Sequence, residues 1–174
     1  MRFWKNQSSE TTVRNGIEKV YPRLWRYCLV LTSNKAQADD LAQAACVRAL
    51  ERSYSFKQGS HFDRWIFRLT QRLWIDELRK AAVRRGGGLS SIEDVDLIDT
   101  EPNPEQTILN REILMGVMQL PEAQRVTVLL VYVEGHSYRD AAKILDIPVG
   151  TIMSRLSIAR SKLVTIFHDH AEVG

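Results

Sequence analysis

The middle of the chain has no periodic pattern of apolar residues, and this gap constrains the fold more than any other feature. The segment begins RRGGG at residues 84–88 and continues LSSIEDVDLIDTEPNPE, and residues 82–105 carry a net charge of −4. Glycine-led, acidic and aperiodic sequence is typical of a solvated linker. A chain of 174 residues divided in this way is long enough for two small domains with modest cores rather than one large core.

Before the linker, apolar residues recur at the spacing of an α-helix. The spacing predicts helices over about 17–31, 37–50 and 62–78, separated by breaks at 32–34 and around Gly59. No strand pattern stands out in this part. The N-terminal part is therefore predicted to be helical throughout.

After the linker, Asn103-Pro104-Glu105-Gln106 is typical of a helix start and predicts a helix to about Leu120. The branched run VTVLLVYV at 126–133 is compatible with a buried strand. A helix over 121–134 is preferred, because Pro121 favours a helix start and Gly135 a helix end.

Two further helices are expected at the C-terminal end. The sequence Ser137-Tyr138-Arg139-Asp140 resembles a capping box that opens a short helix to Leu145, and Asp146-Ile147-Pro148 turns the chain before a helix over about 149–167. Two helices joined by so short a turn form a helix-turn-helix. The predicted fold is all-α, with domains at 14–81 and 106–170 joined by an acidic linker at 82–105.

The composition excludes several classes of protein. With 44% hydrophobic and 26% charged residues and two cysteines, the chain is not a collagen, a disordered tail or a disulfide scaffold. Its longest run without strongly polar side chains, 126–133, is far shorter than the roughly 20 residues of a membrane span, and its start lacks the apolar core of a signal peptide. We expect a soluble cytoplasmic protein in which Cys28 and Cys46 are reduced.

No catalytic or metal-binding motif is present. The four histidines are not at zinc-ligand spacing with the cysteines, and there is no phosphate-binding loop or nucleophile elbow. We therefore expect neither an enzyme nor a protein with a cofactor.

Basic residues gather in the N-terminal part, where residues 14–81 carry a net charge of +6. Within the predicted helix after Gly59, Arg64, Arg68, Arg72 and Arg79 recur on one side, between apolar stripes that are expected to pack on two neighbours. A row of charges is usually only a solvated face, but adjacent arginines repel one another and favour an anionic partner such as nucleic acid. Tyr54 and Phe56 are candidates for stacking on bases, whereas Trp65 and Trp74 are expected in the core.

The last predicted helix has one buried stripe, Ile152-Leu156-Ala159-Leu163, with Ser154 and Ile158 on the opposite side and Thr151 and Arg155 between them. A solvated helix would explain the polar residues but would not favour an exposed isoleucine. An exposed isoleucine can touch a thymine methyl group or a partner protein, and contact with DNA ranks ahead of a solvated surface helix, while helix pairs of this kind also serve in protein contacts.

Three segments are informative together: ADDLAQAACVRAL at 38–50, FKQGSHFDRWIFRLTQRLWIDELRK at 56–80, and the sequence from Leu120 to Leu163 that includes both predicted helices of the helix-turn-helix. In this order they resemble the extracytoplasmic-function sigma factors of bacteria over roughly residues 14–167. The resemblance implies a sigma factor that binds core RNA polymerase, recognises −10 and −35 promoter elements, melts the promoter and initiates transcription of a stress- or signal-responsive regulon. It also implies an anti-sigma partner, which could hold the protein at the membrane.

The resemblance further implies a role for individual residues. The polymerase would be bound by Asp40, Gln43, Val47 and Arg48, of which the first three share one helix side. The −10 element would be bound by Tyr54, Phe56, Lys57, His61, Arg64, Arg68, Arg72 and Arg79. The −35 element would be bound by Ser137, Thr151, Ser154, Arg155 and Ile158.

The sequence departs from the family at several positions. Arg72 stands where the family usually has an asparagine that lines the base pocket, so the −10 preference cannot be transferred, and Ala44 replaces a common glutamate. Two alternatives remain: a sigma mimic that titrates an anti-sigma factor, which would need no basic row, and a stand-alone helix-turn-helix regulator, which would leave 14–81 without a purpose.

Overall fold

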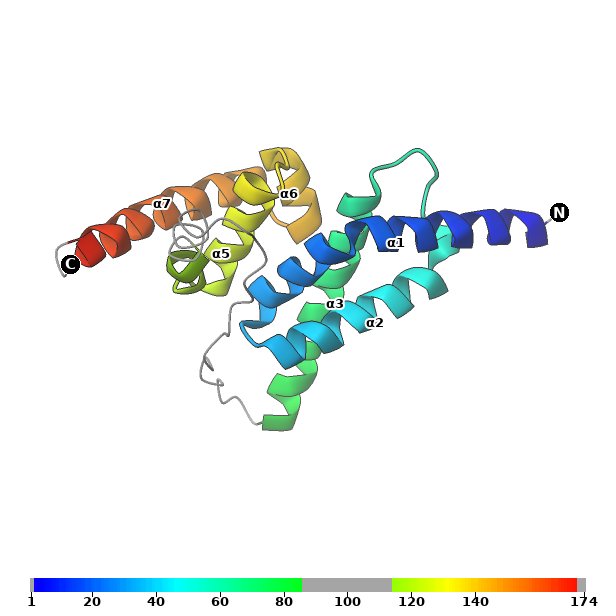
Figure 1. Cartoon of the computed structure of the whole chain (residues 1–174), viewed down its shortest axis with the longest axis horizontal. Coiled ribbons are helices and arrows are strands. Elements are labelled where there is room, and N and C mark those ends of the chain that lie inside the picture. Colours follow the sequence, from blue (N-terminus) through cyan, green and yellow to red (C-terminus); the bar gives the residue numbers. More distant parts are fainter. Residues whose placement is uncertain (1, 86–113, 172–174) are drawn as a thin grey trace, which may run out of the picture. The chain divides into compact units, whose positions relative to one another are not determined.

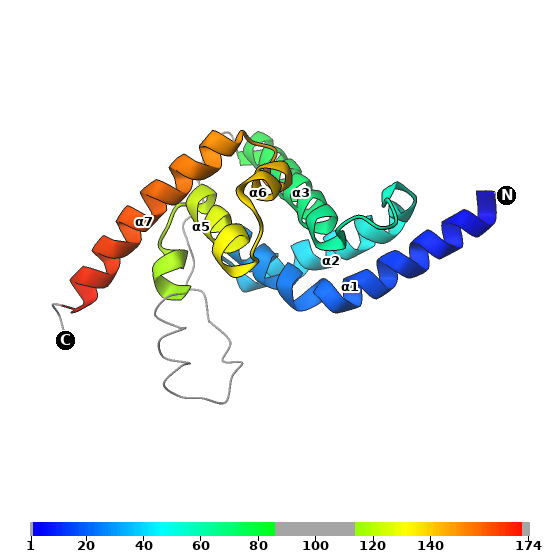
Figure 2. The same cartoon turned by 90° about the horizontal axis from the view of Figure 1, so that it is seen from above.

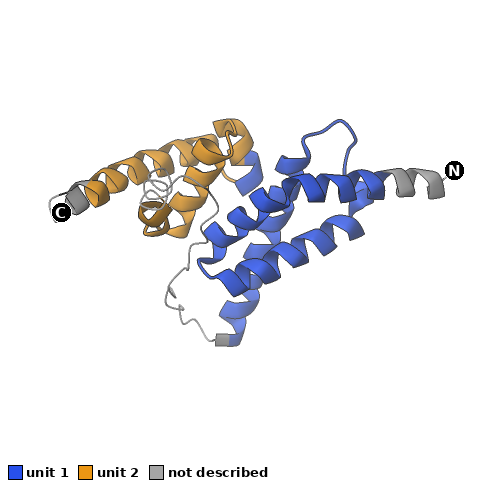
Figure 3. Cartoon of the chain, in the orientation of Figure 1, with its two compact units in different colours: residues 1–93, 143–146 blue, residues 94–142, 147–174 orange. Residues whose placement is uncertain are grey.

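The computed structural model describes residues 2–85 and 114–171, with side chains described for 9–84 and 114–167. It divides into two compact units, residues 1–93 with 143–146 and residues 94–142 with 147–174 (Figure 3). All regular structure in the described residues is helical, as the apolar spacing predicts. Residues 82–85 of the predicted linker belong to the last helix before the gap, whereas 86–105 lie outside the described residues, so the linker itself stays a prediction.

The first unit is built from three long helices, α1 (Arg2–Thr32), α2 (Lys35–Glu51) and α3 (Phe62–Arg85). Figures 1 and 2 show α1 beside α2, with α3 packed against them. The break between α1 and α2 falls at the predicted place, where Ser33 has a left-handed φ of 54° and the Asn34 side chain accepts a 2.9 Å hydrogen bond from the Gln37 amide. Both α1 and α3 are longer than predicted.

All three helices contribute to the core of this unit, and α3 adds large buried side chains where it meets α1. Ile66, Phe67 and Thr70 of α3 are fully buried, and the Phe67 ring stacks on Tyr27 of α1 with centroids 4.9 Å apart. The Tyr27 hydroxyl donates a 2.7 Å hydrogen bond to the Gln71 side chain, which satisfies its polar end. This contact fixes which side of α3 faces away from the core.

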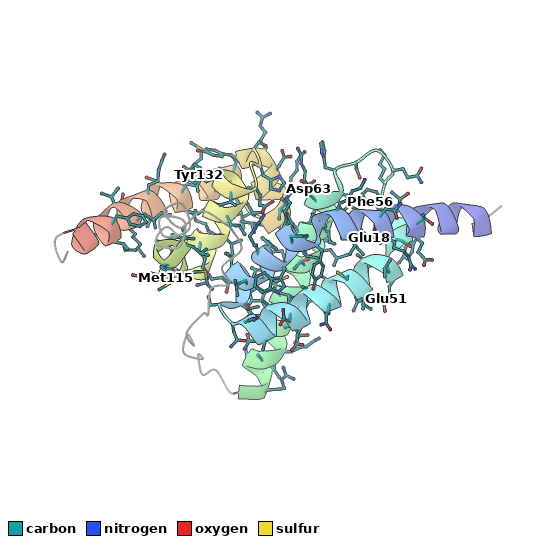
Figure 4. All side chains as sticks on the ribbon, in the orientation of Figure 1. Glu18, Glu51, Phe56, Asp63, Met115 and Tyr132 are labelled. Atoms are coloured by element: carbon teal, nitrogen blue, oxygen red, sulfur yellow. The ribbon has the colours of Figure 1, made fainter. Side chains whose placement is uncertain are left out.

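In the second unit, the branched run is helical rather than a strand. Helix α5 (Glu122–Val128) continues into a π-helical turn over Leu129–Val133, and Gly135 ends it with a φ of 70°. The π turn is closed by a 2.9 Å bond from the Glu134 amide to the Leu129 carbonyl, and a wider turn of this kind shifts the side chains that follow. Tyr132, labelled in Figure 4, is exposed.

Helix α7 (Val149–Ala171) packs against α5 through a stripe that includes Ile152, Leu156 and Ala159. Arg125 of α5 is buried as well, and its guanidinium donates a 3.2 Å hydrogen bond to the Leu120 carbonyl. Burial lowers the pKa of Arg125 from its usual value, and nearby Glu122 opposes this shift.

Helix α6 (Tyr138–Leu145) precedes α7, and the intervening turn at 146–148 uses a left-handed Asp146 with a φ of 57°, a conformation that aspartate tolerates. The predicted pair of helices with a short turn is therefore present. No described helix is long and apolar enough to cross a membrane.

Candidate nucleic-acid interface

The predicted polymerase-binding side of α2 is exposed. Asp40, Gln43 and Val47 face solvent, and Val47 is 57% exposed although it is apolar. The opposite side is buried and consists of Ala38, Leu41, Ala42, Ala45 and Ala49. A helix with small residues inward and an isolated exposed valine outward is suited to docking on another protein.

Arg48 lies at the edge of this side rather than within it. It is half-buried, and its Nε lies 3.5 Å from a carboxylate oxygen of Glu51, one turn further along α2. The side chain also lines a pocket formed with α3, as described below.

The loop between α2 and α3 is anchored by aromatic packing. Phe56 is only 6% exposed and its ring centroid lies 5.4 Å from Phe62 and 5.2 Å from Trp65. The prediction that Phe56 stacks on a base is therefore corrected, because its ring is already packed between protein side chains. Figure 4 labels Phe56 and also Asp63, whose carboxylate lies 3.3 Å from Arg23 of α1 and holds the start of α3.

The rest of the loop presents polar and aromatic groups to solvent. Tyr54 is 71% exposed, and Lys57 and His61 are exposed too. The turn is held by the Ser60 amide, which bonds to the Lys57 carbonyl at 3.0 Å, and by Gly59, whose φ of 82° favours glycine. Tyr54 is thus the aromatic residue of this loop that can stack on an unpaired base without repacking the cluster.

A basic pocket lies between the end of α2 and the middle of α3. Its volume is about 220 Å³, and we call it the basic pocket; it is lined by Arg48, Arg52, Ser55, Trp65, Arg68, Leu69, Arg72, Leu73 and Asp76. The lining therefore combines four guanidinium groups with an apolar wall formed by one indole and two leucine side chains. Such a combination suits a ligand that is both anionic and flat.

The arginines around the basic pocket differ in how far they are neutralised by protein groups. Arg79, beside the pocket, lies 3.5 Å from the Asp76 carboxylate, so the predicted row is interrupted by an acid at this point. By contrast, the described residues provide no hydrogen bond or ion pair to the guanidinium of Arg52 or Arg72, and both side chains are exposed. Their charges are available to an outside partner.

Sequence reasoning missed the basic pocket, although it named three of its four arginines, Arg48, Arg68 and Arg72. Leu69 and Leu73 lie on one of the apolar stripes of this helix that are expected to pack on a neighbour, but both are half-buried and line the pocket. Trp65, expected in the core, is half-buried between the aromatic cluster and the pocket. A signal was present in the sequence, because Arg68 and Arg72 each directly precede one of these leucines.

In the second unit, the predicted capping box is formed. The Ser137 hydroxyl donates a 2.7 Å hydrogen bond to the Asp140 carboxylate and accepts one of 3.1 Å from the Asp140 amide. Both bonds occupy Ser137 in starting α6, so a contact with DNA would add to this structural role.

The predicted DNA-reading side of α7 is open to solvent. Ser154 and Ile158 are exposed, the latter by 49%, while Thr151 and Arg155 are half-buried in the first turns. These four residues lie away from the buried stripe, as their spacing predicts. The side is mixed in chemistry, with one cation, two hydroxyls and one branched apolar group.

The cysteines do not form a candidate metal site. Burial raises the pKa of the Cys28 thiol from its usual 9.0 to about 12, with a further contribution from Cys46, whose own pKa is also raised by burial. Within the described residues, no group of three or more histidines, cysteines or carboxylates could hold a metal ion.

Comparison with known families finds two matches in this chain. Residues 17–84 match the family described as Sigma-70 region 2, and residues 110–163 match Sigma-70, region 4. The first range contains the docking side and the basic pocket, and the second contains α5 to the middle of α7.

Similar proteins match across most of their length. The chain is 34% identical over 167 residues to the ECF RNA polymerase sigma factor EcfG of Rhodopseudomonas palustris, which covers 92% of this chain and 88% of the relative. It is 31% identical to the ECF RNA polymerase sigma-E factor of Escherichia coli, in a match that covers 71% of this chain and 70% of the relative. Among solved structures, the Bartonella quintana sigma factor RpoE in complex with the anti-sigma factor NepR has a TM-score of 0.73 at 26% identity, covering 89% of this chain and 96% of that one.

Proposed function

Because the chain belongs to the ECF sigma factors, which direct transcription initiation by bacterial RNA polymerase, we propose that its first unit docks on core polymerase and binds the opened −10 element. The second unit binds the −35 element through α7. The genes it controls respond to stress or another signal.

The basic pocket carries this proposal. Opening a promoter exposes unpaired bases on a phosphate chain, and the pocket offers guanidinium groups for the phosphates and an indole with two leucines for a base. Arg72, exposed and without a protein partner among the described residues, lies at its edge. A sigma mimic would have no use for such a site.

Regulation by an anti-sigma factor is the second part of the proposal. The solved relative from Bartonella quintana was obtained with its anti-sigma factor bound. In this chain, α2 and α7 expose apolar side chains such as Val47, Met153 and Ile158, which a protein partner could cover.

The test is transcription from purified components. The chain is mixed with core polymerase and a library of promoter fragments, and the 5′ ends of the transcripts are sequenced. We expect starts at a shared distance from two conserved elements, and melting of the upstream element by permanganate footprinting. A matched variant, Arg68→Gln combined with Arg72→Gln, should bind core polymerase like the parent but melt promoters less. If the parent binds an anti-sigma factor yet starts no transcript, the sigma mimic becomes the better description.

A further inference from the structure

The basic pocket differs from a general phosphate-binding surface because an acidic side chain is among its lining residues. Besides its arginines it contains one carboxylate, that of Asp76, which lies one helical turn after Arg72 on α3. A site that only attracted phosphates would be weakened by an acid, because the carboxylate repels them. Asp76 therefore calls for a ligand that donates hydrogen bonds as well as accepting them.

The arginines of the pocket and Asp76 have opposite hydrogen-bonding roles. A guanidinium can only donate hydrogen bonds, whereas an ionised carboxylate can only accept them. Within the described residues, the one bond to the Asp76 carboxylate is the 3.5 Å contact of Oδ1 with Arg79, at the long end of the hydrogen-bond range. The carboxylate can therefore accept further bonds.

Guanine matches this arrangement better than the other bases. It carries two adjacent acceptors, O6 and N7, on one edge, and two adjacent donors, N1–H and the N2 amino group, on the next. Arginine paired with O6 and N7 is the commonest specific contact to a base. Adenine places its N6 amino donor beside N7, so it would set a donor against a guanidinium.

The remaining walls suit a single flat base. Trp65, Leu69 and Leu73 provide an indole and two branched apolar side chains, and stacking on an aromatic ring holds a base without regard to its identity. At about 220 Å³ the pocket is smaller than the roughly 300–1,000 Å³ of sites for drug-sized ligands. One base fits this scale better than a base pair.

We propose that the basic pocket binds a guanine base, with Arg72 donating to O6 and N7 and Asp76 accepting from N1 and N2. The flanking phosphates are neutralised by Arg48 of α2 and by Arg52, which directly follows that helix. This inference rests on the proposed binding of opened DNA by the first unit. The same chemistry is offered by a promoter strand and by a free guanine nucleotide, and the experiment separates these sources.

The experiment measures binding of fluorescein-labelled pentanucleotides to the full chain by fluorescence anisotropy. The probes TTGTT, TTATT and TTCTT differ only in the central base. We expect the parent to bind TTGTT roughly tenfold more tightly than TTATT, the scale of one good bidentate base contact. Equal affinities, or no measurable binding of any probe, would overturn the proposal.

Two variants separate base recognition from charge. Arg72→Gln should weaken binding of all three probes and reduce the ratio of TTGTT to TTATT affinity towards one. Asp76→Ala removes a negative charge, so it should strengthen binding of TTATT, and because it also removes the acceptor for N1 and N2 of guanine it should lower that ratio. The matched control Arg84→Gln, on the same helix outside the pocket, should weaken all probes and keep the ratio. A ratio unchanged in both pocket variants would overturn the assignment.

Competition with GMP and AMP identifies the source of the base. If GMP but not AMP displaces TTGTT from the parent, and GMP no longer does so in Arg72→Gln, the pocket binds a free guanine nucleotide. If neither nucleotide displaces TTGTT, the pocket binds the promoter strand. Transcription with core polymerase is run in parallel. If the chain initiates transcription but shows no preference for the guanine probe, this inference alone is wrong. If it neither initiates transcription nor prefers the guanine probe, the proposed function is wrong as well.

Discussion

The indole Nε1 of Trp25 in α1 donates a 2.6 Å hydrogen bond to Oδ1 of Asp39 in α2. Asp39 directly precedes Asp40, the first residue of the predicted polymerase-binding side. This bond joins two helices across the unit and limits rotation of α2, so it contributes both to stability and to the direction in which the docking side faces.

Trp25→Phe removes this bond while keeping an aromatic ring. Because the acceptor is a carboxylate in a partly buried place, we expect the free energy of unfolding to fall by about 1.5–3 kcal/mol. The measurement is urea denaturation followed by circular dichroism. Asp39→Asn, which retains an oxygen acceptor, should cost less, and an equal loss in both variants would attribute the effect to packing rather than to the bond.

Gly16→Ala should destabilise the chain although alanine favours helices. A Cβ at this position of α1 would lie 2.8 Å from the Phe62 ring, which is held by contacts with Phe56 and Trp65. Overpacking of this kind costs about 1–3 kcal/mol. The matched control is Gly150→Ala in the first turn of α7, where nothing lies within 4 Å of the added atom and alanine should be neutral or stabilising. Equal effects at the two glycines, measured by thermal unfolding, would contradict this reasoning.

Much of the fold could be predicted because it depends on local signals. The helices before the linker follow from apolar spacing, and the helical state of 126–133 followed from Pro121 and Gly135 rather than from its branched residues. The π turn was not predicted, because no local pattern in the sequence marks it; Leu129 and Leu130 within it are buried in the core of the unit.

The candidate site was predicted less completely, because apolar residues at helical spacing do not reveal whether another part of the protein buries them. Phe56 and Leu69 are both apolar residues beside basic ones, yet packing buries the first and leaves the second on a pocket wall. The outward sides of α2 and α7 were predicted more reliably, since buried apolar residues define the opposite side of each helix.

The docking side can be tested by Asp40→Ala combined with Gln43→Ala. Both side chains are exposed, so we expect unchanged helicity and at least a tenfold loss of affinity for core polymerase, the scale of a lost interface anchor. Lys35→Ala, at the start of α2 on another side, is the matched control and should bind like the parent. If the double variant titrates core polymerase with parental affinity, another surface must dock.

The buried thiol of Cys28 predicts a pH dependence of stability. Its pKa of about 12 in the folded chain lies above the usual 9.0, so the unfolded chain releases the proton first as the pH rises. This contribution to stability is complete below about pH 9 and is lost above it, by about 1.4 kcal/mol per pH unit for one group. Urea denaturation between pH 7 and pH 10 should show a shallower decline in Cys28→Ala than in the parent. Cys46→Ala, at a half-buried position, should change the slope less, and identical slopes in all three would contradict the assignment.

The last prediction separates the two kinds of contact proposed for α7. Arg155 is the cation of the four-residue DNA-reading side, whereas Ile158 is exposed and apolar. If Arg155 contacts a phosphate, Arg155→Gln should weaken promoter binding and reduce the slope of log affinity against log salt by about one. If Ile158 touches a base methyl group, Ile158→Ala should weaken binding about fivefold through lost apolar contact and leave that slope unchanged. The measurement is binding of the holoenzyme to promoter DNA across a potassium chloride series, with Ser161→Ala, one turn beyond the reading side, as the control. Parallel salt dependences for Arg155→Gln and the parent would remove Arg155 from the phosphates, because a neutralised phosphate must release its counterions whatever the sequence of the DNA.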